Sequence, residues 1–230
     1  MPIIRAAYWA LRPRHRRPPG GAHPLIAVLF GPPGSGKGTQ AGFMTRDFEL
    51  AHVSTGDMLR AEAGTGSQLG REVAPLMAAG KLVPDDLIVR VIAERLRHDD
   101  VRKGIVLDGF PRTVAQARAL DRMLASTGRG VGLILSLAVP VDDLVERLLG
   151  RAREQGRVDD TADVIRERMH EYEKKTAPVL DHYRASGARV ATIDGVGSVD
   201  DVRRRVRAEV AGALADAPCR QPTRRTADGS

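Results

Sequence analysis

Residues 25–40 read Leu-Ile-Ala-Val-Leu-Phe-Gly-Pro-Pro-Gly-Ser-Gly-Lys-Gly-Thr-Gln, and this stretch decides the fold. The apolar run 25–30 predicts a buried strand, and the glycine-rich segment after it leads into a helix. Glycines permit positive φ and let the backbone approach a ligand closely. The N–H groups of such a loop and the positive end of the helix attract an anion, and Lys37 can reach the β- and γ-phosphates of a nucleotide. The stretch therefore predicts a phosphate-binding P-loop.

The loop departs from the common P-loop pattern at one position. That pattern has Ser or Thr directly after the lysine, whereas here Gly38 follows Lys37 and the hydroxyl belongs to Thr39. Mg²⁺ would then be held mainly by phosphates and water. Asp108 ends the apolar run 105–107, where a carboxylate can order Mg²⁺ through water, and a simple turn before Gly109 is the alternative.

Strand and helix patterns alternate along the chain. Apolar runs without polar alternation predict parallel strands covered on both faces, and helical spacing between them predicts an open α/β sheet. The expected strands are 25–30, about 50–53, 104–108, 132–138 and 188–193. The clearest helices are 113–125, 141–149 and 198–214.

Two segments interrupt this alternation. Residues 54–98 form a long, mostly helical excursion between strands. Residues 151–163 are polar and without apolar periodicity, and a long helix over about 160–185 follows them with Pro178 inside it. An insertion that lacks its own core is expected to move, as a closing lid does.

Charge is distributed unevenly. The net charge is +7, but residues 1–24 contain five arginines and no acid, so the folded body is close to neutral. A whole-domain nucleic-acid surface is therefore not indicated, although the basic arm could contact RNA or lipid head groups. Residues 1–23 and 216–230 are predicted to be disordered tails. Cys219 is the one cysteine, which excludes an internal disulfide and a cysteine metal site, and no apolar run approaches the ~20 residues that span a bilayer.

Arginines accumulate beside the other motifs of the chain. Phosphoryl transfer spreads negative charge over oxygens, so its catalysts need positioned cations more than a general base. Taken singly, each arginine fits a solvated surface residue better than a site residue in this arginine-rich chain, and only its placement next to other motifs makes it a candidate. The candidates are Arg60, Arg112, Arg147, Arg151, Arg157 and Arg168.

Three short motifs have a plain helix-capping interpretation beside a functional one. Ser54-x-x-Asp57 and Thr113-x-x-Gln116 fit capping boxes. Asp85, in Leu-Val-Pro-Asp, fits a helix N-cap.

Together these segments resemble the adenylate kinase family of nucleoside monophosphate kinases, over about residues 26–214. The resemblance rests on the P-loop with Gly38, on Ser-Thr-Gly-Asp-Met-Leu-Arg (54–60), on Gly-Lys-Leu-Val-Pro-Asp (80–85), on Asp-Gly-Phe-Pro-Arg-Thr with Gln116, and on the arginine-rich stretch 147–168. It implies a domain over 24–215 with a P-loop NTPase fold, built on a five-stranded parallel sheet flanked by helices. A helical NMP-binding insertion is implied at about 54–83, and a short lid at about 150–162.

The resemblance also implies residue roles. Catalysis would fall to Lys37, Arg112, Arg151, Arg157 and Arg168. ATP would bind at Gly34, Ser35, Gly36, Lys37, Gly38, Thr39, Arg147 and Gly197. AMP would bind at Thr55, Arg60, Met77, Val83, Gly109, Arg112, Gln116, Arg157 and Arg168. Asp108 would meet Mg²⁺ through water, and Asp159 and Asp160 would anchor the lid.

Two residues bear on the acceptor. Relatives that prefer UMP or CMP usually have Ala in place of Thr55 and Asn in place of Gln116, so AMP is predicted. A UMP/CMP kinase, or a non-catalytic nucleotide- or RNA-binding protein that uses the basic arm, are the alternatives. The resemblance implies a monomeric cytoplasmic enzyme that exchanges ATP, AMP and ADP with Mg²⁺. The short lid lacks the four-cysteine site of many bacterial members, so no structural zinc is expected.

Overall fold

A computed structural model describes residues 24–155 and 161–216. In this part of the chain the strands form one five-stranded sheet in the order β2-β3-β1-β4-β5, and every neighbouring pair is parallel. This confirms the predicted fold class. The strands are β1 (Ile26–Phe30), β2 (Ala51–Ser54), β3 (Ile105–Asp108), β4 (Leu133–Ala138) and β5 (Val190–Asp194).

Strand register brings the candidate site residues to one edge. Asp108 at the end of β3 pairs with Leu29 of β1 and with Ser54 of β2. Because the strands are parallel, the loops that follow β1, β2 and β3 all leave from this carboxyl edge, which is where open α/β sheets bind ligands.

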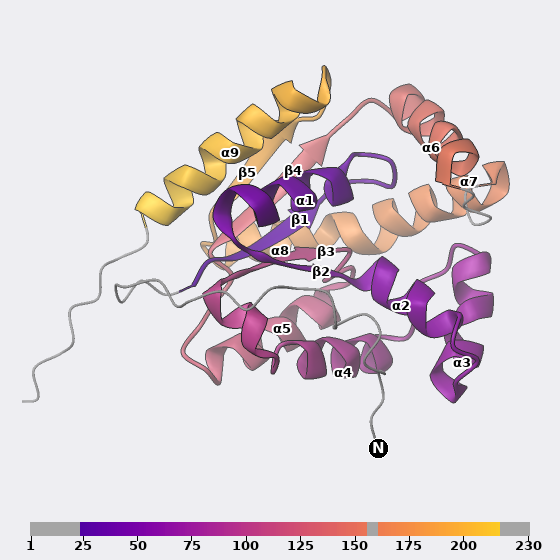
Figure 1. Ribbon diagram of the computed structural model, residues 1–230, viewed down its shortest axis with the longest axis horizontal. Helices are drawn as coiled ribbons and strands as arrows, with labels where there is room; N and C mark the ends of the chain where they lie inside the picture. Colours follow the sequence, from indigo (N-terminus) through magenta and orange to yellow (C-terminus); the bar gives the residue numbers. More distant parts are fainter. Residues whose placement is uncertain (1–23, 156–160, 217–230) are drawn as a thin grey trace, which may run out of the picture.

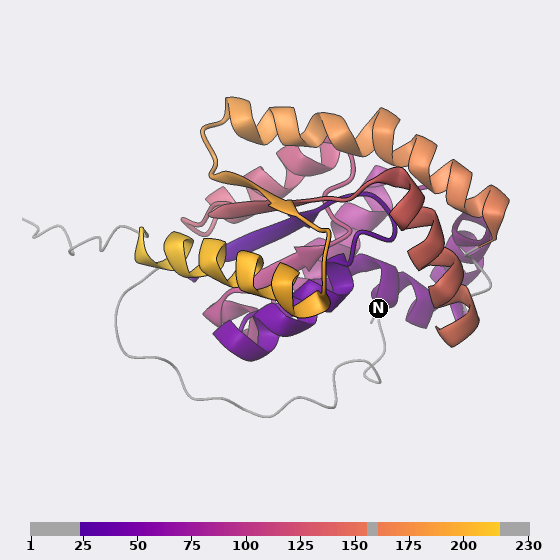
Figure 2. The ribbon, with the colours of Figure 1, turned by 90° about the horizontal axis from the view of Figure 1, so that it is seen from above.

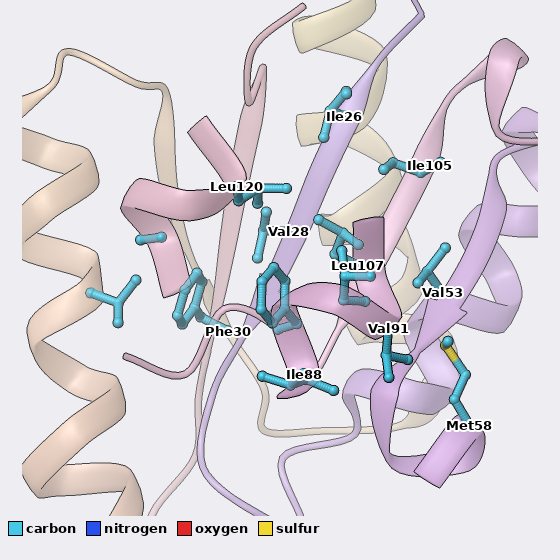
Figure 3. Packing of buried hydrophobic residues seen from close by; sticks show 14 of the residues in the cluster. Ile26, Val28, Phe30, Val53, Met58, Ile88, Val91, Ile105, Leu107 and Leu120 are labelled. Atoms are coloured by element: carbon cyan, nitrogen blue, oxygen red, sulfur yellow. The ribbon is translucent and has the colours of Figure 1, made fainter. Parts of the chain in front are cut away.

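Helices cover both faces of the sheet, and each face has its own apolar core (Figures 1 and 2). On β1 the side chains alternate: Ile26, Val28 and Phe30 pack on one face, and Ala27 and Leu29 on the other. Figure 3 shows the first of these cores. The helices α4 (Asp85–Arg95), α5 (Val114–Ala125) and α8 (Ala177–Ala185) cover its face, and α1 (Lys37–Phe48) and α9 (Val199–Ala215) cover the opposite one.

Two pairs of helices project beyond the carboxyl edge, at the right of Figure 1. One pair is α2 (Thr55–Ala63) and α3 (Gln68–Ala78), and the other is α6 (Val141–Gln155) and α7 (Ala162–Glu171). They touch where Gly80, just after α3, lies against Val164 and Arg168 of α7. The P-loop therefore lies between two helical arms that approach each other.

The structure corrects several boundaries. Helix α6 continues to Gln155, so the first part of the segment expected as a lid is helical. The long helix predicted over 160–185 is divided into α7, the π-helical turn η3 (Tyr172–Thr176) and α8. Pro178 explains the break, because it cannot donate the hydrogen bond that would continue an α-helix through this turn.

The chain ends also differ from expectation. Strand β5 is an edge strand and is partly exposed, so its apolar run is not covered on both faces. Asp216, expected in the tail, ends α9 and forms an ion pair with Arg189 at 2.5 Å. Arg157, Asp159 and Asp160 and the tails 1–23 and 217–230 lie outside the described residues. None of the helices that the structure describes is long and apolar enough to cross a bilayer.

Close packing of α2 against α3 depends on Gly70. Replacing it by alanine should lower the free energy of unfolding by about 1–2 kcal/mol, although alanine favours a helix by up to about 1 kcal/mol over glycine. The reason is that a Cβ at position 70 would lie 2.4 Å from the backbone oxygen of Glu62. Urea unfolding followed by circular dichroism measures the change.

Gly42 in α1 is the matched control, since a Cβ added there would meet no neighbouring atom within 4 Å. Gly42→Ala should therefore leave stability unchanged or raise it by up to about 1 kcal/mol. Equal stabilities for the two variants would contradict the packing argument.

Candidate active site

The loop between β1 and α1 has the shape that the sequence predicts for a P-loop. Gly34 has φ +83°, and a Cβ there would lie 2.9 Å from the backbone oxygen of Leu144, so only glycine fits. Gly36, with φ +91°, turns the chain into α1, whose first residue is Lys37. No described side chain caps this helix start, so its first N–H groups are left for a ligand.

A cavity of about 930 Å³ opens at the carboxyl edge of the sheet, between the two helical arms. Every site residue that the sequence predicts within the described ranges lines it, from the P-loop through Thr55, Met77, Val83 and Gln116 to Gly197. Arg157 is the one predicted catalytic or binding residue outside those ranges, and the predicted lid residues Asp159 and Asp160 lie outside them too. A cavity of this size, lined by both arms, has room for more than one ligand group.

Positive charge is concentrated in this cavity. Burial lowers the pKa of Lys37 from 10.5 to about 8, Asp108 opposes the shift, and Arg112, Arg151 and Arg168 add to it. Burial also lowers the pKa of Arg112, with Arg168 and Arg60 contributing in the same direction. Cations from the P-loop, from both arms and from the β3–α5 loop thus act on one another, as in a site built for a polyanion.

Each of the two central cations is held by backbone oxygens. Lys37 Nζ donates to the carbonyls of Gly31 at 2.8 Å and Pro32 at 2.9 Å. Arg112 Nε donates to the carbonyl of Gly109 at 2.8 Å, and the hydroxyl of Thr176 in η3 donates to the Arg112 carbonyl at 3.1 Å. Both side chains therefore have fixed positions.

Gly109 is required for this arrangement. Its φ is +79°, and a Cβ would lie 2.7 Å from Thr55 Oγ1 and 2.9 Å from Arg112 Nη2. The peptide bond between Phe110 and Pro111 is cis. The loop thus carries Arg112 and the carbonyl that binds Thr55 in one compact turn.

Asp108 is the carboxylate nearest the P-loop in the cavity, 3.5 Å from the position of a Cβ on Gly38. Burial would raise its pKa, but the neighbouring Lys37, His52 and Arg112 bring the pKa below its ordinary value. Asp108 is therefore ionised at neutral pH. His52 Nε2 lies 3.6 Å from Asp108 Oδ2.

A resident metal ion would need more oxygen ligands than the described residues offer. They contain no group of three or more His, Cys, Asp or Glu side chains that could hold a metal. One ionised carboxylate beside a phosphate loop fits instead a Mg²⁺ ion that arrives with a nucleotide and keeps several of its waters.

On the acceptor side, the capping interpretations are only partly right. Ser54 and Thr113 do cap α2 and α5 by accepting from the backbone N–H groups of Asp57 and Gln116. The Gln116 side chain does not return to the cap residue, because its Oε1 accepts from the Arg112 N–H at 2.7 Å. Asp85 is not an N-cap: Pro84 holds that position.

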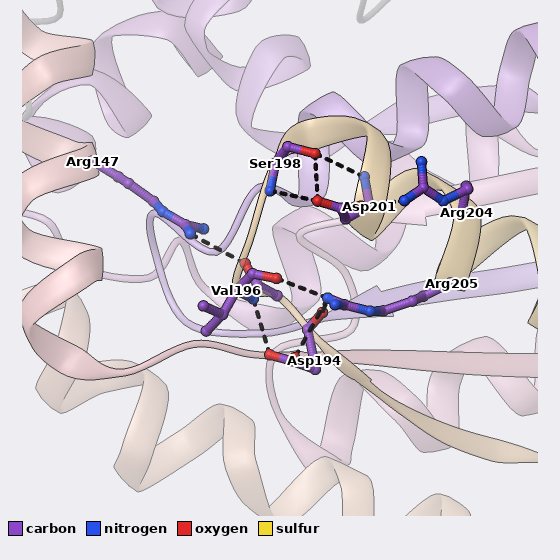
Figure 4. Close-up of polar contacts among 8 residues, drawn as sticks. Arg147, Asp194, Val196, Ser198, Asp201, Arg204 and Arg205 are labelled. Carbon is purple, nitrogen blue, oxygen red and sulfur yellow. Dashed lines mark hydrogen bonds and ion pairs between the residues drawn. The ribbon is translucent and has the colours of Figure 1, made fainter.

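Near the P-loop, the cavity is bounded by the loop between β5 and α9 (Figure 4). Arg147 Nη2 donates to the carbonyl of Gly195 at 3.1 Å. Arg205 donates to the carbonyls of Asp194 and Val196, at 2.7 and 2.8 Å, and Ser198 with Asp201 forms a complete capping box at the start of α9. The loop that contains Gly197 is therefore fixed from both sides.

Sequence reasoning missed several lining residues: His52, Glu171, Tyr172 and Thr176. His52 interrupts an apolar strand, which is a readable signal of a polar cavity next to β2. The other three lie in or beside η3, and the only signal for that turn was Pro178 in a long helical pattern.

Known proteins are similar to this chain in sequence over most of its length. The sequence model of the adenylate kinase family matches residues 29–188. The chain is 49% identical over 183 residues to an adenylate kinase of Stenotrophomonas maltophilia (strain K279a), covering 80% of this chain and 97% of that protein. It is 47% identical over 179 residues to an adenylate kinase of Xylella fastidiosa (strain 9a5c), covering 78% and 95%. The protein belongs to the adenylate kinase family.

Proposed function

We propose that the protein transfers the γ-phosphoryl group of ATP reversibly to AMP and gives two ADP. Its enzyme class is that of an ATP:AMP phosphotransferase, as in its close relatives. The observation that carries the proposal is one continuous cavity that is lined by the P-loop, by Thr55, Met77, Val83 and Gln116, and by cations from both arms.

The donor nucleotide is assigned to the P-loop end. Its phosphates would accept hydrogen bonds from the loop and helix N–H groups between Gly34 and Thr39. Its base would lie between Arg147 and the loop that contains Gly197, since Arg147 already contacts that loop. The guanidinium plane of Arg147 can stack on a base.

The acceptor nucleotide is assigned to the pocket between α2, α3 and the β3–α5 loop. Thr55 Oγ1 donates to the carbonyl of Gly109 at 2.9 Å, so the oxygen presents only lone pairs to the cavity. The 6-amino group of adenine is a donor that suits these lone pairs. Met77 and Val83 supply apolar contact for the base, and Arg60 lies where a phosphate would meet it.

The transfer itself needs charge neutralisation and alignment. The AMP phosphate oxygen attacks the γ-phosphorus in line, and the new bond forms as the bond to the ADP oxygen breaks. Lys37 and Arg112 would stabilise the charge that spreads over the transferred oxygens. Arg151 and Arg168 reach the same region from the helical arm of α6 and α7, and Arg157 is assigned to the same task. Mg²⁺, bound to the phosphates and ordered through water by Asp108, would supply further charge neutralisation.

The two arms would also exclude water, which is a competing acceptor of the phosphoryl group. The insertion at about 54–83 and the lid at about 150–162 are proposed as the moving parts. Both nucleotide sites come from one chain, which supports a monomer, and both substrates are cytoplasmic metabolites, which supports that location.

An acceptor panel tests the proposal directly. With Mg·ATP as donor, the protein should phosphorylate AMP with a kcat/KM at least 10²-fold above UMP, CMP or GMP, because buried polar groups built for adenine remain unpaired with other bases. A coupled ADP assay measures each rate. Higher turnover of UMP or CMP than of AMP would establish the pyrimidine kinase instead.

Replacing Arg112 by alanine should lower kcat by about 10³-fold or more, since a cation on the transferred group is removed. The thermal midpoint should stay close to that of the wild type. Arg118→Ala, on the exposed face of α5, removes the same charge outside the cavity and should retain full activity. Full activity of Arg112→Ala would refute its assignment.

The pKa of Lys37 near 8 predicts proton uptake on ATP binding. The phosphates of ATP favour the ammonium form of Lys37, so ATP binding raises the pKa of Lys37. Above about pH 8 the free protein has lost this proton and must take it up to bind, so the affinity for ATP falls by up to about tenfold per pH unit. Calorimetry at pH 8.5 in two buffers of different ionisation enthalpy measures the proton uptake. ATP does not contribute, because the pKa of its terminal phosphate is about 6 and it is already ionised at this pH. Lys37→Met should abolish it; the same uptake in that variant would assign the proton to another group.

A further inference from the structure

We propose that Asp85 is a positioning residue that fixes the orientation of the Gln116 amide and thereby makes the acceptor site select a 6-amino purine over a 6-oxo purine. The inference rests on the proposed function, in which the base of AMP lies against Gln116. It concerns a residue that touches no substrate in the proposed arrangement and acts through its neighbour.

The Gln116 amide has partners of opposite kinds at its two ends. Nε2 donates to Asp85 Oδ1 at 2.7 Å, and Oε1 accepts from the Arg112 backbone N–H at 2.7 Å. The other Asp85 oxygen accepts from Thr113 Oγ1 at 2.7 Å, which holds the carboxylate in place. Gln116 is only 2% exposed, so water cannot replace a lost partner easily.

Turning the amide over would be unfavourable at both ends. It would place the NH₂ group against the Arg112 N–H and the amide oxygen against the Asp85 carboxylate. A donor would then face a donor, and an acceptor would face an anion, in a buried place where such contacts are costly. Asp85 supplies the stronger of the two constraints because its bond is assisted by a negative charge.

The fixed amide leaves one N–H and one oxygen lone pair for a base. Adenine offers the complement, with an acceptor at N1 and a donor at its 6-amino group. Hypoxanthine and guanine offer the reverse, with a donor at N1 and an acceptor at O6, and would need the amide turned over. AMP is therefore selected in two ways: adenine forms favourable hydrogen bonds with the fixed amide, and a 6-oxo purine would have to turn the amide into unfavourable contacts.

The chain contains a matched control for the charge of Asp85. Asp86 is its neighbour in the first turn of α4, so both carboxylates interact equally with the helix dipole. The Asp86 side chain is 79% exposed and lies 3.8 Å from Arg90, away from Gln116. A role of Asp85 in α4 stability alone predicts similar effects for the two residues.

The experiment compares Asp85→Ala with Asp86→Ala, using AMP and inosine monophosphate, which share every atom outside the base edge, as acceptors. For Asp85→Ala we expect the KM for AMP to rise about tenfold, with kcat and the KM for ATP within about twofold of the wild type. The reason is that the contact between Gln116 and adenine is made equally in the ground state and in the transition state, so weakening it affects AMP binding and not the chemical step. The AMP-to-IMP ratio of kcat/KM should fall about tenfold. Asp86→Ala should change none of these values.

Two further variants separate positioning from folding. Asp85→Asn should restore most of the selectivity, since its oxygen can accept from Gln116 while its NH₂ donates to Thr113. Asp85→Ser suits the start of a helix but is too short to reach Gln116, so it should lose selectivity as Asp85→Ala does, and it serves if the alanine variant does not fold.

The outcomes distinguish the two levels of the argument. An unchanged AMP-to-IMP ratio in Asp85→Ala or Asp85→Ser, even with lower activity towards both acceptors, would overturn the role of Asp85 and leave the proposed function intact. A wild-type protein that does not phosphorylate AMP would overturn the proposed function, and the inference with it.

Discussion

Repulsion between buried cations is the constraint on which the site depends. Lys37 and Arg112 each have a pKa lowered mainly by burial, and Arg168 lowers both further, while Asp108 is the carboxylate that opposes these shifts. Backbone carbonyls that accept hydrogen bonds from Lys37 and Arg112, together with the charge of Asp108, stabilise the two central cations. Polyphosphate removes the repulsion, so the energy stored by folding the cations together becomes binding energy for a nucleotide pair.

The sheet makes this concentration of charge possible. Parallel pairing places the ends of β1, β2 and β3 side by side, and from them emerge the P-loop, the start of α2 and the loop of Arg112. The apolar cores on both faces hold the strands at fixed register, so charges contributed by distant parts of the chain meet at one edge. The helical arms bring the remaining arginines: Arg60 from α2, Arg151 from α6 and Arg168 from α7.

Most of the sheet and the residues of the cavity can be predicted from the sequence, because both are encoded locally. An apolar run predicts a strand, and a glycine-rich run with Lys37 predicts a phosphate loop whatever the rest of the chain does. The local pattern wrongly predicts that Asp85 is an N-cap. It cannot reveal the side chains that Asp85 contacts, Thr113 and Gln116, because they are 28 and 31 residues away in the sequence. The turn η3 and the full length of α6 are also not predicted: Pro178 is a local signal for a break in the helix, but it does not specify a π-helical turn five residues long.

In the proposed function, donor and acceptor would be recognised by different physical means. On the P-loop side the recognising groups are backbone N–H groups and glycines, which bind phosphate and place little demand on the base. On the acceptor side the recognising group is a buried amide whose two ends are already committed to Arg112 and Asp85. A backbone loop cannot be turned over, whereas an amide side chain can, so base selectivity needs a second residue that prevents rotation. The proposed role of Asp85 thus accounts for a carboxylate that bonds to the Gln116 amide.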